Sequence, residues 1–118
     1  MSDRVRLSRS AKRLLFLLCE HYNTRIRYGT SEEEACIFGG AQQLIDRLGL
    51  SDSPANVSSW ARELAKAEMI SALFEDNGLA ESELSPEGIA YYESRFDDLK
   101  KLFPDAISLA GSLFSLLG

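Results

Sequence analysis

Apolar residues recur at helical spacing near both ends of the chain. Within about residues 8–22 they share one broad face, formed by Ala11, Leu14, Leu15, Leu18 and Tyr22 and widened by Phe16 and Leu17. A second stripe at the same spacing, Ile89, Tyr92, Phe96 and Leu99, follows Pro86. We therefore expect two helices packed against each other across the core, the second running from Pro86 to about Leu102 and ended by Pro104.

Two shorter amphipathic helices are predicted in the middle of the chain. The first covers about residues 40–48 and is followed by Gly49, where a left-handed C-terminal cap belongs. Ser53 is a good N-cap and Pro54 a good first helical residue, so the second helix should cover about residues 54–67. Two short helices joined by a tight polar turn predict a helix-turn-helix arrangement.

An antiparallel hairpin should follow these helices. Residues 70–74 and 79–84 have strand-like composition, and the dipeptide Asn77-Gly78 lies between them. Asn-Gly between two such runs is the strongest short-range signal for a hairpin turn. A helix then opens at Ser85-Pro86, with serine as N-cap and proline as first helical residue.

The segment from residue 23 to residue 40 is harder to place. Residues 24–28 alternate like a strand, residues 30–34 are polar and loop-like, and residues 35–38 form a short apolar run suited to a small strand. Two alternatives stay open. The segment forms either an extra hairpin that presents Arg25 and Arg27 to phosphate, or a mobile loop.

In this order the elements resemble the winged helix-turn-helix superfamily, in the small prokaryotic and phage branch that includes MarR-like regulators. Residues 43–50, 57–70 and 84–92 carry the resemblance, which covers about residues 8–100. The last stretch, Leu-Ser-Pro-Glu-Gly-Ile-Ala-Tyr-Tyr, is similar to the Leu-Thr-x-x-Gly segment that opens the helix after the wing. The resemblance implies an α+β, mainly helical fold, a winged helix-turn-helix with a two- or three-stranded wing and an additional C-terminal helix.

The chain then divides into a winged helix-turn-helix domain with a basic N-terminal arm, residues 1–103, and an apolar C-terminal helix, residues 104–118. One residue departs from the family pattern. Glycine usually precedes the wing, and this chain has Glu68 there. If that turn needs a positive φ, glutamate makes it costlier by about 1 kcal/mol.

The resemblance implies a DNA-binding transcriptional regulator that places the helix at about residues 54–67 in the major groove. With Val57, Ala61 and Leu64 on the inner face, we expect polar side chains to point outward. They are of the types that contact base edges and phosphates, and they are Asn56, Ser58, Ser59, Arg62 and Lys66. An ordinary solvated helix face is the alternative.

Charge is distributed unevenly around a net value of −5. Residues 1–27 carry seven basic and two acidic side chains, whereas residues 28–118 carry six basic and sixteen acidic ones. Because neutralised phosphates supply most nonspecific DNA affinity, we expect the basic N-terminal side chains to contact the DNA backbone. These are Arg4, Arg6, Arg9, Lys12 and Arg13.

Acidic residues on the predicted wing favour a different function. Glu75, Asp76, Glu81 and Glu83 would each be repelled by phosphate. Either the helix and the basic N-terminus bind DNA without the wing, or the carboxylates protect an edge strand from pairing, or the domain binds protein. A protein-protein interaction module, an adaptor or inhibitor that does not bind DNA, is therefore the alternative function.

The C-terminal segment is apolar over most of its circumference, which calls for a partner. We expect it to form a homodimer through Ile107, Leu109, Ala110, Leu113, Phe114 and Leu117. Completion of the core and contact with a membrane are the alternatives. The segment is shorter than the roughly twenty residues that span a bilayer, so a membrane partner is not expected.

Composition and motifs give no support for catalysis, a metal or a cofactor. A chain of 118 residues with 45% hydrophobic residues buries enough surface to fold without a metal or disulfide. His21 has no ligand or nucleophile pattern around it and is expected at the surface or boundary. Cys19 and Cys36 are expected to be reduced core residues of a cytoplasmic protein that lacks a signal peptide, with a redox pair as the alternative.

Overall fold

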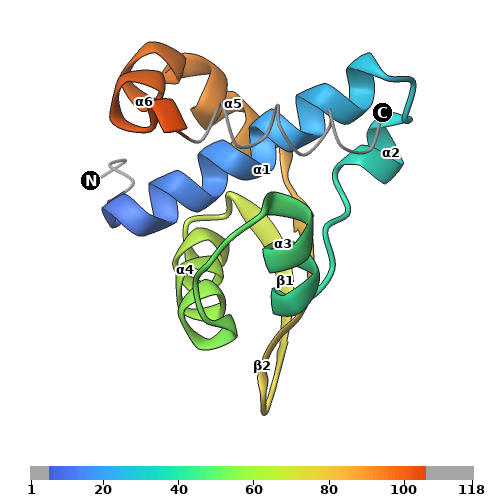
Figure 1. Cartoon of the computed structure of the whole chain (residues 1–118), viewed down its shortest axis with the longest axis vertical. Coiled ribbons are helices and arrows are strands. Elements are labelled where there is room, and N and C mark those ends of the chain that lie inside the picture. The colour runs from blue at the N-terminus through green and yellow to red at the C-terminus, as the bar shows by residue number, and fades with distance from the viewer. Residues whose placement is uncertain (1–5, 106–118) are drawn as a thin grey trace.

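The computed structural model describes residues 6–105. Within this range it contains six helices and one two-stranded antiparallel sheet, an α+β, mainly helical arrangement (Figure 1). In chain order the elements are α1 Arg9–Arg27, α2 Glu32–Ala35, α3 Ala41–Leu48, α4 Pro54–Lys66, β1 Ile70–Glu75, β2 Gly78–Leu84, α5 Pro86–Ser94 and α6 Phe96–Leu102. Figure 1 shows α5 and α6 on one side of α1, α3 and α4 on the other, and the hairpin extending away from α1.

Helix α1 forms the centre of the core. Its residues 14–19 are all buried, which means that the helix is covered around its whole circumference there. On one side the Phe16 ring packs against Tyr92, Phe96 and Phe103, with centroid separations of 5.7, 6.2 and 6.1 Å. The prediction that this helix packs against the apolar stripe after Pro86 is therefore confirmed.

Serine side chains start the helices that the sequence predicts. Ser8, Ser53 and Ser85 each accept a hydrogen bond from the backbone N–H three residues ahead. Gly49 ends α3 in the left-handed conformation with φ 66°, as predicted. The local sequence thus determines where α1, α4 and α5 begin and where α3 ends.

The interpretation of residues 24–34 is wrong. Instead of a strand, residues 24–27 continue α1, and the Thr24 hydroxyl donates to the Glu20 carbonyl 2.9 Å away. Ile26 lies four residues after Tyr22, so the helical spacing of partly buried side chains continues here. Residues 32–35 form the short helix α2 rather than a loop. In the apolar run that follows, only Ile37 forms a β-bridge, to Glu83.

The helix predicted over residues 86–102 is interrupted at Arg95. α5 ends at Ser94 and α6 begins at Phe96. Arg95 has φ −120°, and its guanidinium stacks over the Tyr91 ring, 4.7 Å from the centroid. No glycine or proline marks this break, so the sequence pattern gave no reason to expect it.

The hairpin forms as predicted, with its turn one residue earlier. β1 and β2 pair from Ile70 with Leu84 to Glu75 with Gly78, with an irregularity between Leu73 and Phe74. Asp76 and Asn77 make the turn, and Gly78 has φ 114°. Gly78 is therefore the first residue of β2 and not part of the turn itself.

The helices found within residues 6–105 include none that is long and apolar enough to cross a membrane. The residues expected to mediate homodimerisation, Ile107 to Leu117, lie outside the described part of the chain.

His21 is buried rather than at the surface, which corrects the prediction. Its side chain is 5% exposed and packs against the Phe38 ring at a centroid separation of 5.6 Å. Burial, followed by the nearby positive charges of Arg25 and Arg47, lowers the pKa of His21 to about 4. The imidazole is therefore neutral in the folded protein at physiological pH.

We expect acid to destabilise the protein through His21. The unfolded chain binds a proton near pH 6.5, whereas the folded chain does so only near pH 4. This contribution to stability is therefore complete above pH 6.5, and between pH 6.5 and 4 it falls by about 1.4 kcal/mol per pH unit. NMR titration of this single histidine should give a pKa near 4. The variant His21→Gln should lose this part of the pH dependence, and a measured pKa near 6.5 would contradict the prediction.

Glu68 adopts a left-handed backbone conformation, in which glutamate is costlier than glycine. It has φ 63° and is the one residue other than glycine with positive φ in the described chain. Its N–H donates to the Ala65 carbonyl at 3.0 Å, and its carbonyl accepts the Ser85 hydroxyl at 2.7 Å. The left-handed residue therefore ends α4 and directs the chain into β1, at a steric cost to a side chain with a Cβ.

Replacing Glu68 by glycine should stabilise the fold. Glycine removes the strain at φ 63°, and we expect a gain of about 0.5–1 kcal/mol in the free energy of unfolding measured with urea. Glu68→Ala is the matched control, because it removes the carboxylate but keeps the Cβ. Equal stability of the two variants would show that charge, rather than backbone strain, decides the outcome.

Candidate nucleic-acid interface

Helix α4 presents a polar strip opposite its buried face. Asn56, Ser59, Arg62 and Lys66 are exposed, whereas Val57, Ala61 and Leu64 are buried. At about 100° per residue, the four exposed positions lie on the side of the helix that faces away from the core. We call these four residues the α4 strip.

Ser58 does not belong to the α4 strip, contrary to the prediction. Its side chain is 6% exposed, and its hydroxyl accepts a hydrogen bond from the Leu79 N–H at 3.0 Å. The neighbouring Gly78 has no room for a side chain, because a Cβ there would lie 2.6 Å from the Ser58 Oγ. Ser58 therefore joins α4 to the start of β2 and is not accessible to a ligand.

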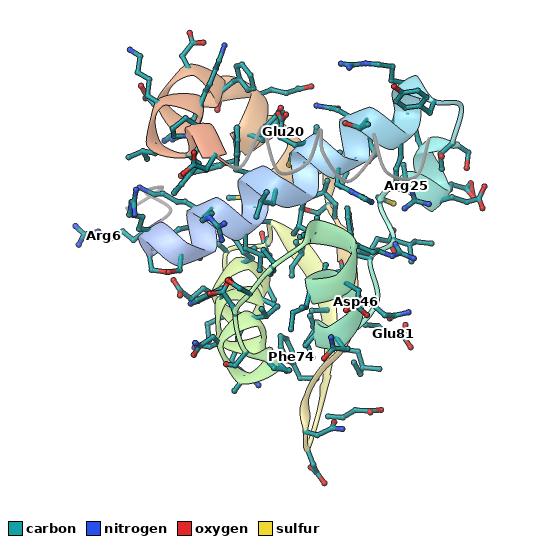
Figure 2. The ribbon with its side chains drawn as sticks, viewed as in Figure 1. Arg6, Glu20, Arg25, Asp46, Phe74 and Glu81 are labelled. Atoms are coloured by element: carbon teal, nitrogen blue, oxygen red, sulfur yellow. The ribbon has the colours of Figure 1, made fainter. Side chains whose placement is uncertain are left out.

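Arg62 joins the α4 strip to the hairpin. Its guanidinium lies over the Phe74 ring, 4.1 Å from the centroid, which is a favourable cation–π geometry. In Figure 2 Phe74 lies between α4 and the hairpin. The stacked ring limits the directions that the Arg62 side chain can take, while the side chain as a whole stays exposed.

The N-terminal end of α1 is attached to α4. The Ser8 backbone N–H and hydroxyl both donate to the Glu63 carboxylate, at 3.0 and 2.8 Å. Arg6 is exposed and extends away from α1 (Figure 2), and Lys12 is half-buried. Neither of these two side chains forms a hydrogen bond or ion pair with the described residues, so both are available to an anionic partner.

The other predicted phosphate contacts are engaged within the protein or cannot be placed. Arg9 donates to the Leu102 carbonyl at 3.3 Å and lies over the Phe103 ring. Arg13 forms an ion pair with Asp52, in the turn before α4, at 3.8 Å. Arg4 lies outside the described residues. The basic N-terminal region thus has fewer free cations near α4 than its composition suggests.

The hairpin carries the acidic charge that the sequence predicts. Glu75, Asp76, Glu81 and Glu83 are all exposed. Residues 41–84, which span α3, α4 and the hairpin, contain three basic and eight acidic side chains. The net negative charge of this region disfavours contact with phosphate.

Two arginines that sequence reasoning did not connect hold the segment between α2 and α3. Arg25 donates to the Ala35 and Ile37 carbonyls at 3.5 and 3.4 Å, and Arg47 donates to the Ile37 carbonyl at 2.9 Å. Burial, followed by Arg47, lowers the pKa of Arg25. The suggested hairpin at Arg25 and Arg27 is wrong, because both residues belong to α1.

The two cysteines are free and chemically protected. Burial raises the pKa of Cys19 well above its ordinary value. Cys36 donates to the Glu33 carbonyl at 3.1 Å and to the Glu83 carboxylate at 3.6 Å, and its pKa is raised by burial and then by Glu83. Both side chains are therefore neutral thiols near pH 7, in the form that is the weaker nucleophile.

A buried polar contact joins α1 to α5. The Tyr92 hydroxyl donates to the Glu20 carboxylate and accepts from the Asn23 amide at 3.4 Å. Burial, followed by the hydrogen bond to Glu20, raises the pKa of Tyr92. Tyr92 belongs to the apolar stripe predicted after Pro86, and its hydroxyl needs this partner because it lies in the interior. Among residues 6–105 there is no cluster of ligands that could hold a metal ion.

No protein-family model, curated protein or solved structure matches the chain.

Replacing Ser58 should be costly, whereas replacing its neighbour should not. Ser58→Ala removes the acceptor for the buried Leu79 N–H, and we expect a loss of about 1–3 kcal/mol in the free energy of unfolding. Ser59→Ala, one residue further along the same helix but exposed, should change stability by less than about 0.5 kcal/mol. Denaturation of both variants with urea measures the difference. A Ser58→Ala variant as stable as Ser59→Ala would show that the Ser58 hydroxyl contributes nothing to stability.

Proposed function

We propose that this chain is a winged-helix DNA-binding protein, a transcriptional regulator of the prokaryotic or phage type, that places α4 in the major groove of duplex DNA. The order of its elements supports the proposal. α1, α3 and α4 are followed by the β1–β2 hairpin and α5, which is the order that the resemblance implies. In this proposal the hairpin is the wing.

The α4 strip is the observation that carries the proposal. Asn56, Ser59 and Arg62 lie at intervals of three residues on a 13-residue helix, facing away from the core. These side chains combine hydrogen-bond donors and acceptors, and the major groove admits a helix and presents a distinct donor and acceptor pattern for each base pair. Lys66, one turn further, is suited to a phosphate.

Arg62 is the residue best suited to recognise a base. Arginine donates two hydrogen bonds to the O6 and N7 atoms of guanine, and this contact depends on the orientation of the guanidinium plane. Stacking on Phe74 restricts that orientation before DNA binds, which reduces the entropy lost on binding. Asn56, on the first turn of α4, is the type of side chain that pairs with adenine.

The proposed interface makes few phosphate contacts. The cations best placed to make them are Lys66, Arg6 and Lys12. In this proposal the carboxylates of the wing do not approach the DNA backbone. Because each neutralised phosphate contributes to the salt dependence, we infer a complex with moderate nonspecific affinity and a shallow salt slope.

A second candidate function is a protein-protein interaction module that does not bind DNA. The excess of eight acidic over three basic side chains in residues 41–84 favours it, since most proteins that bind duplex DNA present the opposite balance.

Duplex binding tests the proposal. Titration of the protein against a pool of labelled duplexes, followed by fluorescence anisotropy, should give binding at about 50 mM salt that weakens with a log–log slope of about −3. Arg62→Ala should reduce discrimination between duplexes by about 10- to 100-fold, because a base contact is lost. Arg6→Ala should weaken binding to all sequences alike.

Lys101→Ala on α6 is the matched control, because it removes an exposed cation on another helix and should leave both affinity and discrimination unchanged. No detectable duplex binding at about 50 mM salt would exclude the DNA-binding function and favour the interaction module. If Arg62→Ala and Arg6→Ala both leave binding unchanged, the α4 strip is not the DNA-binding surface.

A further inference from the structure

The outer face of the hairpin combines exposed apolar side chains with acidic ones. Ile37 and Leu73 are 51% and 50% exposed, which is high for large apolar residues. Together with Ser71, Glu81 and Glu83 they line a shallow depression of about 430 Å³. Exposed apolar side chains gathered in one depression are typical of an interaction surface.

One edge of the sheet is open. β1 pairs with β2 along one side, whereas its other side forms no backbone hydrogen bonds with the described residues. An unpaired strand edge is a template for a further strand. A second depression, of about 560 Å³, includes Ser71 and Ala72 of β1 together with Glu68 and Glu87. Because both depressions contain Ser71 and Ala72, they meet at β1.

A strand added at this edge would project its side chains over both depressions. Side chains along a strand point alternately to its two faces, so one set would meet Glu81 and Glu83 and the other would meet Glu68 and Glu87. Both faces are acidic. The added segment must therefore carry positive charge.

The register of the sheet defines where the cations belong. Ser71 pairs with Glu83, and Leu73 pairs with Glu81. A long cationic side chain can cross the short Ser71 to reach Glu83, and another can lay its aliphatic stem on Leu73 to reach Glu81. Glu81 and Glu83 are two residues apart on one strand, so the complementary segment has cations at positions i and i+2, about 7 Å apart.

The chain itself contains such a segment. Arg4-Val5-Arg6 has two cations at this spacing, separated by a β-branched residue that suits a strand. Arg6 is exposed and forms no hydrogen bond or ion pair with the residues that the structure describes. We call residues 1–6 the basic arm. Leu7, the residue after it, packs against the core.

A second copy of the chain is the source of the basic arm that best fits the open edge of β1. The bonds from Ser8 to Glu63 hold the base of the basic arm beside α4. Figure 1 shows that the N-terminal end of α1 and the hairpin lie on different sides of α4. We propose that the open edge of β1 receives the basic arm of a second copy of this chain, with Arg4 and Arg6 over Glu81 and Glu83. Reciprocal exchange of two arms closes a symmetric dimer.

A charge exchange between two variants tests this interface. In Arg4→Glu/Arg6→Glu an acidic arm faces an acidic hairpin, and in Glu81→Arg/Glu83→Arg a basic arm faces a basic hairpin. Each variant alone should associate at least about tenfold more weakly than the unmodified chain, because like charges meet at the edge. An equimolar mixture of the two variants should associate again, because both of its arm–hairpin contacts join opposite charges.

Sedimentation velocity at about 50 mM salt, over protein concentrations from about 1 μM to about 1 mM, measures the association. Control variants with the same charge changes elsewhere, Arg27→Glu/Lys101→Glu and Asp97→Arg/Asp98→Arg, should associate like the unmodified chain. The altered side chains are exposed or lie outside the described residues, and circular dichroism checks that each variant is folded.

Three results would overturn the proposal. The unmodified chain could stay monomeric over the whole concentration range. The two reversed variants could each associate like the unmodified chain, which would place the contact elsewhere, for example at residues 107–117. Or the mixture could stay as weak as its components, which would exclude contact between the arm of one copy and the hairpin of another. The inference assigns Arg6 to the hairpin of a second copy, so in such a dimer the phosphate contacts of the proposed function would come from Lys12 and Lys66. The measurement uses no DNA, so failure of the proposed function and failure of this inference are distinguishable outcomes.

Discussion

The fold depends on the burial of the middle of α1, residues 14–19, around the whole circumference of the helix. Phe16 is covered by the rings of Tyr92, Phe96 and Phe103, while other residues of the same helix pack against α3 and α4. A helix covered in this way cannot shift without opening two interfaces at once. α4 takes its position from this contact, and the exposed side of α4 is a consequence of which side is buried.

Two smaller contacts then determine the orientation of α4 relative to the hairpin. The hydroxyl of Ser58 accepts from the Leu79 N–H, and the guanidinium of Arg62 stacks on Phe74. The Ser58–Leu79 hydrogen bond is buried, whereas the Arg62–Phe74 contact lies at the surface. α4 and the hairpin are therefore in contact both in the interior and at the surface. The α4 strip and the acidic outer face of the hairpin thus belong to elements that contact each other but carry opposite chemistry. This supports assigning them to different partners.

Much of the fold could be predicted from short-range signals. Serine caps, Pro54, Gly49 and the Asn77-Gly78 pair each act within a few residues, and their consequences could be inferred without knowledge of the tertiary structure. Contacts between distant segments could not be inferred in this way. The pair of Arg25 and Arg47 on one carbonyl depends on residues 10 to 12 positions apart that only the complete fold brings together.

Some errors could have been avoided with the signals available. His21 lies four residues after Leu17 and three after Leu18, which places it on a buried side of the helix. Ser58 is three residues before Ala61 and next to Val57, at the margin of the buried face. In both cases the prediction followed the polarity of the side chain rather than its position on the helix. The interruption at Arg95 is different, because the segment contains no glycine or proline, the residues that most strongly disfavour a continuous helix.

The bonds between Ser8 and Glu63 have a thermodynamic consequence. They connect the start of the first helix to the residue next to Arg62 on α4. A ligand that displaces residues 6–8 and breaks these two hydrogen bonds changes the free energy of the side-chain arrangement around Arg62. Linkage is reciprocal, so a ligand on α4 would then alter affinity at the chain's beginning by the same factor. One carboxylate could in this way couple two binding events that share no contact.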